Sequence, residues 1–225
     1  MDLNMYIIIA ILIVFVFSIF CQINVKTTFN KYNKRKSEKG NTAAEVARAI
    51  LDDNQLFNVK VEHISGRLSD HYDPSSNIVR LSDAVYDSTA IGAIGVAAHE
   101  CGHAIQHNTD YSFIKLRTAL VPVVNFANTS WFWLFLAGMF LNFVGLINIA
   151  IVLFACVTLF QLVTLPVELD ASSRAIRIIG EQGLVTPEEV PQARKVLTAA
   201  AMTYIAALAM SLVQLIRLVL IARKN

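Results

Sequence analysis

The sequence predicts a mostly α-helical membrane protein with about four transmembrane helices and a small α+β region. Hydrophobic residues make up 55% of the 225-residue chain, and the mean hydropathy is +0.53. Both values exceed those of ordinary soluble domains, and the apolar residues gather in long runs. The net charge is only +2, which gives no sign of a nucleic-acid partner. The three cysteines show no paired spacing, so we expect a reducing compartment and no disulfide framework.

Four apolar runs are long enough to be membrane segments. The first is interpreted as a retained anchor, because Asp2 precedes it without a basic residue and Phe20 stands where signal-peptide cleavage needs a small residue. The second and third are separated by a few residues near Asn142 and predict a tight helical hairpin. The last run either spans the membrane or lies in its interface. The runs are Met5–Cys21, Leu120–Met139, Val144–Leu165 and Ala199–Ile216.

Basic residues follow the anchor and predict the orientation of the chain. Their density beside a membrane segment favours a cytoplasmic location for this side. An even number of crossings separates the polar block Gln22–Arg117 from the block at about Pro166–Thr198, so both are expected on that side. The basic residues are Lys26, Lys31, Lys34, Arg35, Lys36 and Lys39.

The first polar block carries signals for helices and strands. Thr42–Glu45 is a capping box that opens a helix through about Asn54. A second helix, capped by Ser88 or Thr89, is expected to run to about Asn108. Between them we expect a strand from Val59 to about Gly66, a turn-rich loop over Asp70–Asn77, and a short strand over Asn77–Ser82.

The second of these helices contains the motif that indicates chemistry. His99 and His103 stand at i and i+4, so their imidazoles share one helical face and can occupy adjacent corners of a zinc site. Glu100 projects beside the same position, where it can take a proton from a zinc-activated water. The preceding residues Ile91–Ala98 are small and apolar, which indicates a buried helix. The motif therefore predicts a small zincin-like catalytic region built around an HExxH helix.

A catalytic zinc site needs a third protein ligand. His107 extends the i+4 series, but one further turn rises about 5.4 Å and would carry it beyond a shared metal. Glu168 follows the third apolar run on the same side of the membrane, in the first turn of a helix that can begin at Pro166. Asp170 is the alternative, because the requirement for a third ligand does not by itself separate the two carboxylates. We expect Glu168.

Four segments of the chain resemble the YugP-like family of neutral zinc metallopeptidases of bacterial membranes. The resemblance covers nearly the whole chain, and the chain is similar, more distantly, to HtpX-type membrane peptidases. In the latter a Glu on a later helix is the third zinc ligand, which implies that role for Glu168. In those peptidases an Asp four residues after this Glu orients a histidine ligand. The corresponding position here is Ser172. The orienting residue is therefore Ser172 or Asp170, or the chain has no equivalent. The segments are Asp70–Pro74 (DHYDP), Asn77–Ser82 (NIVRLS), Ala98–His107 (AHECGHAIQH) and Pro166–Arg174 (PVELDASSR).

The expected reaction is peptide hydrolysis by a water that zinc activates, with Glu100 as general base and then proton donor to the leaving amine. The strand Asn77–Ser82 is a candidate for pairing with an extended substrate. His71, Tyr72 and Arg174 are candidate donors to the developing oxyanion, although an ordinary loop or surface role is the better expectation for each. Cys101 is interpreted as a packing residue.

The expected organisation places the active site on the cytoplasmic face of a multi-pass cell-membrane protein. Expected partners are a peptide or membrane-protein substrate and membrane lipid, and association with a second copy or another membrane protein is left open. The alternative function is a zinc-binding scaffold without catalysis. The expected regions are an anchor (1–22), a catalytic region (23–117), a transmembrane hairpin (118–166), a cytoplasmic helical segment with the third ligand (167–198), and a C-terminal transmembrane or interfacial helix (199–225).

Overall fold

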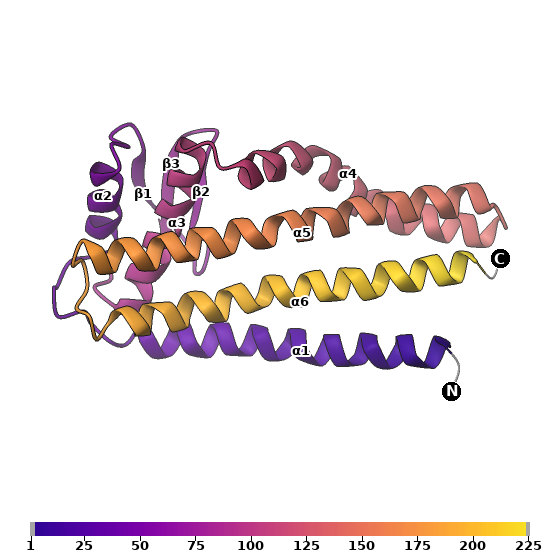
Figure 1. Cartoon of the computed structure of the whole chain (residues 1–225), viewed down its shortest axis with the longest axis horizontal. Coiled ribbons are helices and arrows are strands. Elements are labelled where there is room, and N and C mark those ends of the chain that lie inside the picture. Colours follow the sequence, from indigo (N-terminus) through magenta and orange to yellow (C-terminus); the bar gives the residue numbers. More distant parts are fainter. Residues whose placement is uncertain (1–2, 224–225) are drawn as a thin grey trace. The chain divides into compact units, whose positions relative to one another are not determined.

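The computed structural model describes residues 3–223 and confirms the expected fold class of long helices with one small sheet. Asp2, whose charge argues against a signal peptide, lies outside the described residues, as do Met1, Lys224 and Asn225. The elements in chain order are α1 (Leu3–Tyr32), α2 (Ala43–Asp53), β1 (Lys60–Ile64), β2 (His71–Asp73), β3 (Ile78–Ser82), α3 (Ile91–Asn108), α4 (Ser112–Phe140), α5 (Val144–Glu181) and α6 (Val190–Ala222) (Figure 1).

Four helices of the described chain are long and apolar enough to cross a membrane. They are α1, α4, α5 and α6, and each contains one of the four expected apolar runs. Large apolar side chains such as Leu12, Phe15 and Val16 of α1 are exposed, as expected of a surface that faces lipid. The chain therefore has the helices of a multi-pass membrane protein.

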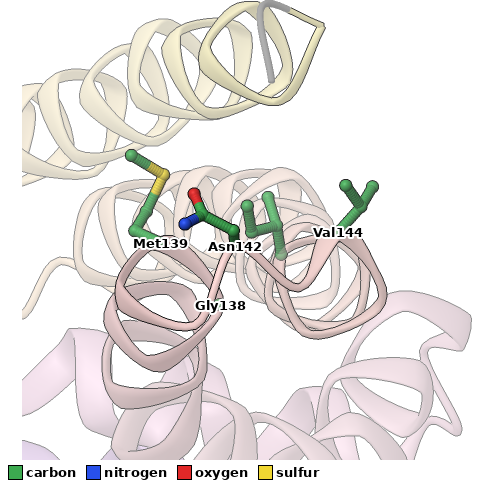
Figure 2. A pocket seen from close by; sticks show the side chains of 5 residues that line it. Gly138, Met139, Asn142 and Val144 are labelled. Atoms are coloured by element: carbon green, nitrogen blue, oxygen red, sulfur yellow. The ribbon is translucent and has the colours of Figure 1, made fainter.

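The chain forms two compact units, and the first contains most of the apolar residues. It consists of Met1–Cys21, Ser112–Pro166 and Thr203–Asn225. Within it α4 and α5 form the expected tight hairpin, in which the rings of Trp131 and Phe154 lie 4.7 Å apart. At the turn a Cβ on Gly138 would lie 2.9 Å from the backbone nitrogen of Ile147, so only glycine allows this approach. A small pocket beside the turn is lined by Gly138, Met139, Asn142, Val144 and Ile147 (Figure 2).

The second unit consists of Gln22–Tyr111 and Val167–Met202 and contains most of both predicted polar blocks, while Ser112–Arg117 and Pro166 belong to the first unit. Its sheet has the order β1-β3-β2, with β1 parallel and β2 antiparallel to β3. The sequence predicted β1 and β3 but placed β2 inside a loop. Because β3 has a neighbour on each side, the expectation that the strand Asn77–Ser82 pairs with an extended substrate is wrong. The edge strands of the sheet are β1 and β2, and β2 contacts α3.

The HExxH helix α3 lies in the core of the second unit, packed against α2. The capping box that opens α2 is confirmed: Glu45 N–H donates to Thr42 Oγ1, and Thr42 N–H donates to the Glu45 carboxylate. The expected cap of α3 is wrong, because its N-cap is Ala90, which has no side chain that can accept. The hydroxyl of Ser88 instead accepts from the N–H of Ala90 at 3.2 Å.

The prediction that a new helix begins at Pro166 is also wrong. Helix α5 runs without a break from Val144 to Glu181, with Pro166 in its interior (Figure 1). A proline removes one backbone hydrogen bond from a helix, here to the carbonyl of Leu162, and the helix-forming residues on both sides keep the rest. Glu168 is therefore an interior residue of a long helix and does not lie in the first turn of a new one.

Candidate metal centre

His99 and His103 lie one turn apart on α3, and their rings face the same side of the helix. The ring centroids are 4.7 Å apart and the ring planes are nearly perpendicular, at 80°. His103 is buried and His99 is half-buried. The i, i+4 spacing thus places two imidazoles side by side in a largely dry environment, as the sequence predicted.

Glu168 of α5 completes a three-residue cluster with the two histidines. Its Oε2 lies 3.3 Å from Nε2 of His99 and 3.7 Å from Nε2 of His103, and the three side chains offer ligand atoms that all lie within 4.8 Å of one another. Zinc bonds nitrogen and oxygen ligands at about 2.1 Å, so two ligands at corners of one tetrahedron lie about 3.4 Å apart. The donor types and the two distances to Glu168 therefore fit a tetrahedral zinc site.

The two helices approach so closely because α3 has a glycine at the contact. A Cβ added to Gly102 would lie 2.7 Å from the carbonyl oxygen of Ala171 and 3.2 Å from its Cα. Ala171 itself is fully buried. Since real Cβ atoms do not come within 3.0 Å of a backbone oxygen, Gly102 is the residue that lets α5 bring Glu168 beside the histidines. The HExxH spacing alone did not indicate this role.

Glu100 is buried beside the cluster and is held by the edge strand. Its Oε2 accepts a 3.0 Å hydrogen bond from the backbone N–H of Tyr72 in β2. Strand β2 thus donates a backbone N–H to the carboxylate of Glu100, which stands one residue after the ligand candidate His99 in α3. This position suits a group that moves a proton next to a metal.

The acidic neighbours of His103 raise the pKa of its imidazole. Burial by itself would lower the pKa of His103, but its hydrogen bond with Glu168 and the charges of Glu100 and Glu168 outweigh burial and raise the pKa. A cluster that stabilises a proton on an imidazole in this way also stabilises a divalent cation that replaces the proton. Binding of zinc to such a site releases protons.

The structure separates the other candidate residues from the cluster. Asp170 accepts from Arg174 Nε at 2.6 Å and from Gln106 Nε2 at 2.8 Å, and it is not a member of the cluster. The ring of His107 lies 5.5 Å from that of Tyr72, and His107 also stands outside the cluster. Among the described residues, then, the group of possible metal ligands around His99 contains Glu168 and neither of its rivals.

The three candidate oxyanion donors are occupied by other contacts. Tyr72 donates its hydroxyl to Asn77 Oδ1 at 2.7 Å, and burial, followed by the charge of Asp73, raises its pKa. His71 uses Nδ1 at 2.8 Å from the Ser69 carbonyl. Arg174 is tied to Asp170. These contacts agree with the expectation that each has a loop or surface role.

Two contacts on the far side of the histidine rings were not foreseen in full. Ser172 Oγ lies 3.1 Å from Nδ1 of His99, which was one of the open alternatives. Gln106 Oε1 lies 3.0 Å from Nδ1 of His103, and sequence reasoning missed it. The available signal was spacing, because Gln106 stands three residues after His103 and shares its helical face.

The fold and the site define a class, and comparison with known proteins identifies it. The family model described as "Putative neutral zinc metallopeptidase" matches residues 6–223, and the chain belongs to this family. The resemblance found in the sequence is thereby confirmed, and zinc is the cofactor that the family implies. The chain is similar to a Bacillus subtilis (strain 168) protein called "Putative membrane protease YugP", with 49% identity over 204 residues that cover 91% of each chain. No solved structure matches the chain.

Proposed function

We propose that the chain is a membrane zinc endopeptidase in which His99, His103 and Glu168 hold the metal and Glu100 is the general base. The observation that supports this most strongly is the convergence of the three donors, with Glu168 Oε2 at 3.3 Å and 3.7 Å from the two histidine nitrogens. A buried carboxylate between two imidazoles is costly unless a cation or proton compensates it. The membership of a zinc metallopeptidase family supports the same metal.

The proposed reaction gives each residue one task. When bound, zinc lowers the pKa of a water molecule and polarises the scissile carbonyl. Glu100 accepts the proton of the attacking water and delivers it to the nitrogen of the leaving amine, so it begins and ends the cycle as a carboxylate. His99, His103 and Glu168 would hold the metal with two neutral nitrogens and one negative oxygen, and three protein ligands are the set with which a catalytic zinc site can still accept water or substrate.

The edge strand β2 is the proposed substrate-binding strand, in place of β3. In an antiparallel pair, residues alternate between those that bond their partner and those whose backbone groups point outward. Tyr72 belongs to the outward set, because its N–H donates to Glu100 and not to its partner Val79. A substrate in extended conformation can pair with the outward backbone groups of β2 that are not bonded to Glu100, and its side chains then alternate toward and away from the site.

The proposed location of the site is the cytoplasmic face of the membrane. The support is the exposed basic stretch at the end of α1 and the linker after it, which follows the first apolar run directly. The ligand Glu168 comes shortly after an apolar segment of α5, and α3 belongs to the polar unit. We therefore propose cleavage of loops or soluble tails of proteins at the membrane surface. The division of the chain at residues 22, 117, 166 and 198 stays part of this proposal.

The Glu100→Gln variant tests the proposed function. Glutamine keeps the shape and can still accept from Tyr72 N–H, but it cannot take a proton, so we expect a loss of cleavage of about 10²–10⁴-fold with zinc still bound near one equivalent. Glu62→Gln, an exposed position of β1, is the matched control. The assay uses the detergent-solubilised full chain, a peptide library read by mass spectrometry, and metal analysis. Equal cleavage by the zinc-loaded Glu100→Gln variant and the wild type would overturn the proposed mechanism.

A further inference from the structure

Each histidine of the cluster has one nitrogen toward Glu168 and the other toward a neutral partner. Nε2 of both rings faces Glu168 Oε2, while Nδ1 of His99 contacts Ser172 Oγ at 3.1 Å and Nδ1 of His103 contacts Gln106 Oε1 at 3.0 Å. A histidine can bind a metal through Nε2 only if the proton of the neutral ring is on Nδ1. The partner of Nδ1 therefore decides whether the ring is ready for the metal.

Gln106 has a fixed orientation because both neighbours of its amide nitrogen can only accept. Nε2 of Gln106 donates to the carbonyl oxygen of Val167 and to Oδ2 of Asp170, each at 2.8 Å. The side chain is completely buried, with 0% exposure. If the amide were turned around, its oxygen would face two other oxygens, and the two hydrogen bonds to Val167 and Asp170 would be lost without water to replace them.

The fixed amide determines the state of His103. With Nε2 of Gln106 committed to Val167 and Asp170, the oxygen Oε1 must face His103 and can only accept a hydrogen bond. Nδ1 of His103 must then carry the proton, and the lone pair of its Nε2 points to the side of Glu168. Ser172 does not impose such a choice on His99, because a hydroxyl rotates and both donates and accepts.

Asp170 is the anchor of this arrangement. Its Oδ2 accepts from Gln106 and also from Arg174 Nε at 2.6 Å, so the carboxylate is held on α5 by an i, i+4 ion pair. Arg174 in turn lies over the ring of Tyr111, 5.8 Å from its centroid. A line of contacts thus runs from Arg174 through Asp170 and Gln106 to His103, and it crosses from α5 to α3.

We propose that Gln106 is a positioning residue that holds His103 in its metal-binding tautomer, and that Asp170 acts through Gln106 by fixing the direction of its amide. The proposal rests on the proposed zinc site of His99, His103 and Glu168. It gives Asp170 a role that is distinct from ligation. It also makes the two histidines unequal, since His103 is locked by a buried amide and His99 is only supported by a hydroxyl.

A merely structural role for Gln106 has a different consequence. A buried amide that only joins α3 to α5 would affect stability, and Asp170 would then matter through its contact with Arg174. The positioning role instead depends on the oxygen of residue 170 as an acceptor, whether or not that residue is charged. Asp170→Asn retains an oxygen that can accept from Gln106 and Arg174, whereas Asp170→Ala removes it.

The test is the zinc dissociation constant of the detergent-solubilised full chain, measured by competition with a chromogenic chelator. We expect Gln106→Leu to weaken zinc binding by about 10–100-fold, and Asp170→Ala to weaken it less. The zinc dissociation constant of Asp170→Asn should lie within about twofold of the wild-type value. Residue 170 is not a metal ligand in this proposal, and its side chain keeps an oxygen that can accept a hydrogen bond from Gln106. Gln192→Leu, at a half-buried glutamine of α6 outside the metal cluster, is the control for the glutamine-to-leucine change.

A second readout follows the tautomer directly. In protein with ¹⁵N-labelled histidine, long-range ¹⁵N–¹H spectra of the zinc-free wild type, recorded at a pH at which His103 is neutral, should show the Nδ1-protonated tautomer of His103, and Gln106→Leu should show a mixture of tautomers. Unchanged zinc affinity in folded Gln106→Leu would overturn the proposal. If that variant does not fold, equal zinc affinity of Asp170→Ala and Asp170→Asn overturns it. A wild type that binds no zinc would instead overturn the proposed function and this inference together.

Discussion

Gly102 of α3 and Ala171 of α5 are in backbone contact, and a Cβ on Gly102 would lie 2.7 Å from the carbonyl oxygen of Ala171. Ala171 lies three residues after Glu168, so this contact sets the distance from the carboxylate to the histidines. The cluster of His99, His103 and Glu168 is therefore a property of how two helices meet, and not of α3 alone. Gly102 stands between the two histidines in the sequence of α3.

We predict that Gly102→Ala loses zinc binding. The added methyl group must push α5 away from α3, which costs about 1–3 kcal/mol of stability if the helices can separate and moves Glu168 away from the histidines. Gly95→Ala on the same helix is the matched control, because its Cβ would meet Ala193 at an ordinary 3.5 Å. Zinc stoichiometry and thermal unfolding measure both effects. Full zinc occupancy in Gly102→Ala would show that the close approach does not matter for the site.

We predict that Glu168→Ala lowers zinc affinity by more than about 100-fold, beyond the loss expected for a residue outside the metal shell. The reason is that, of the three described residues that could hold the metal ion together, the variant leaves only the two histidines. Asp170→Asn is the matched test of the rival ligand and should keep its zinc. Isothermal titration calorimetry, with zinc added to the metal-free protein, compares the zinc affinities of Glu168→Ala and Asp170→Asn. The reverse order of affinities would make Asp170 the ligand.

Cys101 is predicted to be inert toward both metal and alkylating reagents. It is completely buried, its Sγ donates to the carbonyl of Ala47 at 3.5 Å, and burial followed by the charge of Glu100 raises its pKa far above the ordinary value. A thiol that stays protonated is neither a nucleophile nor a zinc ligand. In a variant that also carries Cys21→Ser and Cys156→Ser, Cys101 is the remaining cysteine, and maleimide should react with it only after the protein is unfolded.

Cys101→Ala should accordingly keep one equivalent of zinc. This variant separates the catalytic function from the alternative of a closed structural site, in which Cys101 would be a fourth protein ligand. Loss of zinc from Cys101→Ala would favour the scaffold.

The stability of the zinc-free protein should depend on Asp73 at neutral pH and less so in acid. Hydrogen bonds from Ser75, Ser76 and Arg80 hold the pKa of Asp73 well below its usual range. A carboxyl whose pKa is lowered by folding stabilises the protein above its unfolded pKa of about 3.9, and this contribution disappears as the pH falls through the folded pKa. Asp73→Asn should therefore lower the unfolding temperature at pH 7, and the gap to the wild type should narrow below about pH 4.

The control for the pH experiment is Asp87→Asn, an exposed position. Both variants are compared in the presence of a chelator, since acid would otherwise release zinc and change stability by another route. If the difference in unfolding temperature between Asp73→Asn and the wild type stays constant with pH, Asp73 stabilises the hairpin without its charge.

Local patterns in the sequence predicted the parts of the structure that depend on neighbours along the chain. The i, i+4 spacing of His99 and His103 and the capping box at Thr42 need only a helix, and both are present. The apolar runs predicted the four long helices in the same way. The choice of Glu168 required one further step, the count of membrane crossings that puts both polar blocks on one side.

The features that the sequence did not predict depend on contacts between distant segments. Strand β2 has three residues and is defined by its pairing with β3. Helix α5 continues past Pro166, and its later part packs against α3 through the contact of Ala171 with Gly102, which no local pattern at the proline could indicate. The orientation of Gln106 depends on acceptors that lie more than sixty residues away.

X-ray absorption at the zinc edge of the zinc-loaded full chain tests the central claim most directly. The account predicts one zinc per chain with two imidazole ligands and the remaining ligands oxygen, at about 2.0–2.2 Å, and a loss of this signal in Glu168→Ala. Three imidazoles, or a sulfur at about 2.3 Å, would contradict it, because either result would bring His107 or Cys101 into the site and close the position that the attacking water needs.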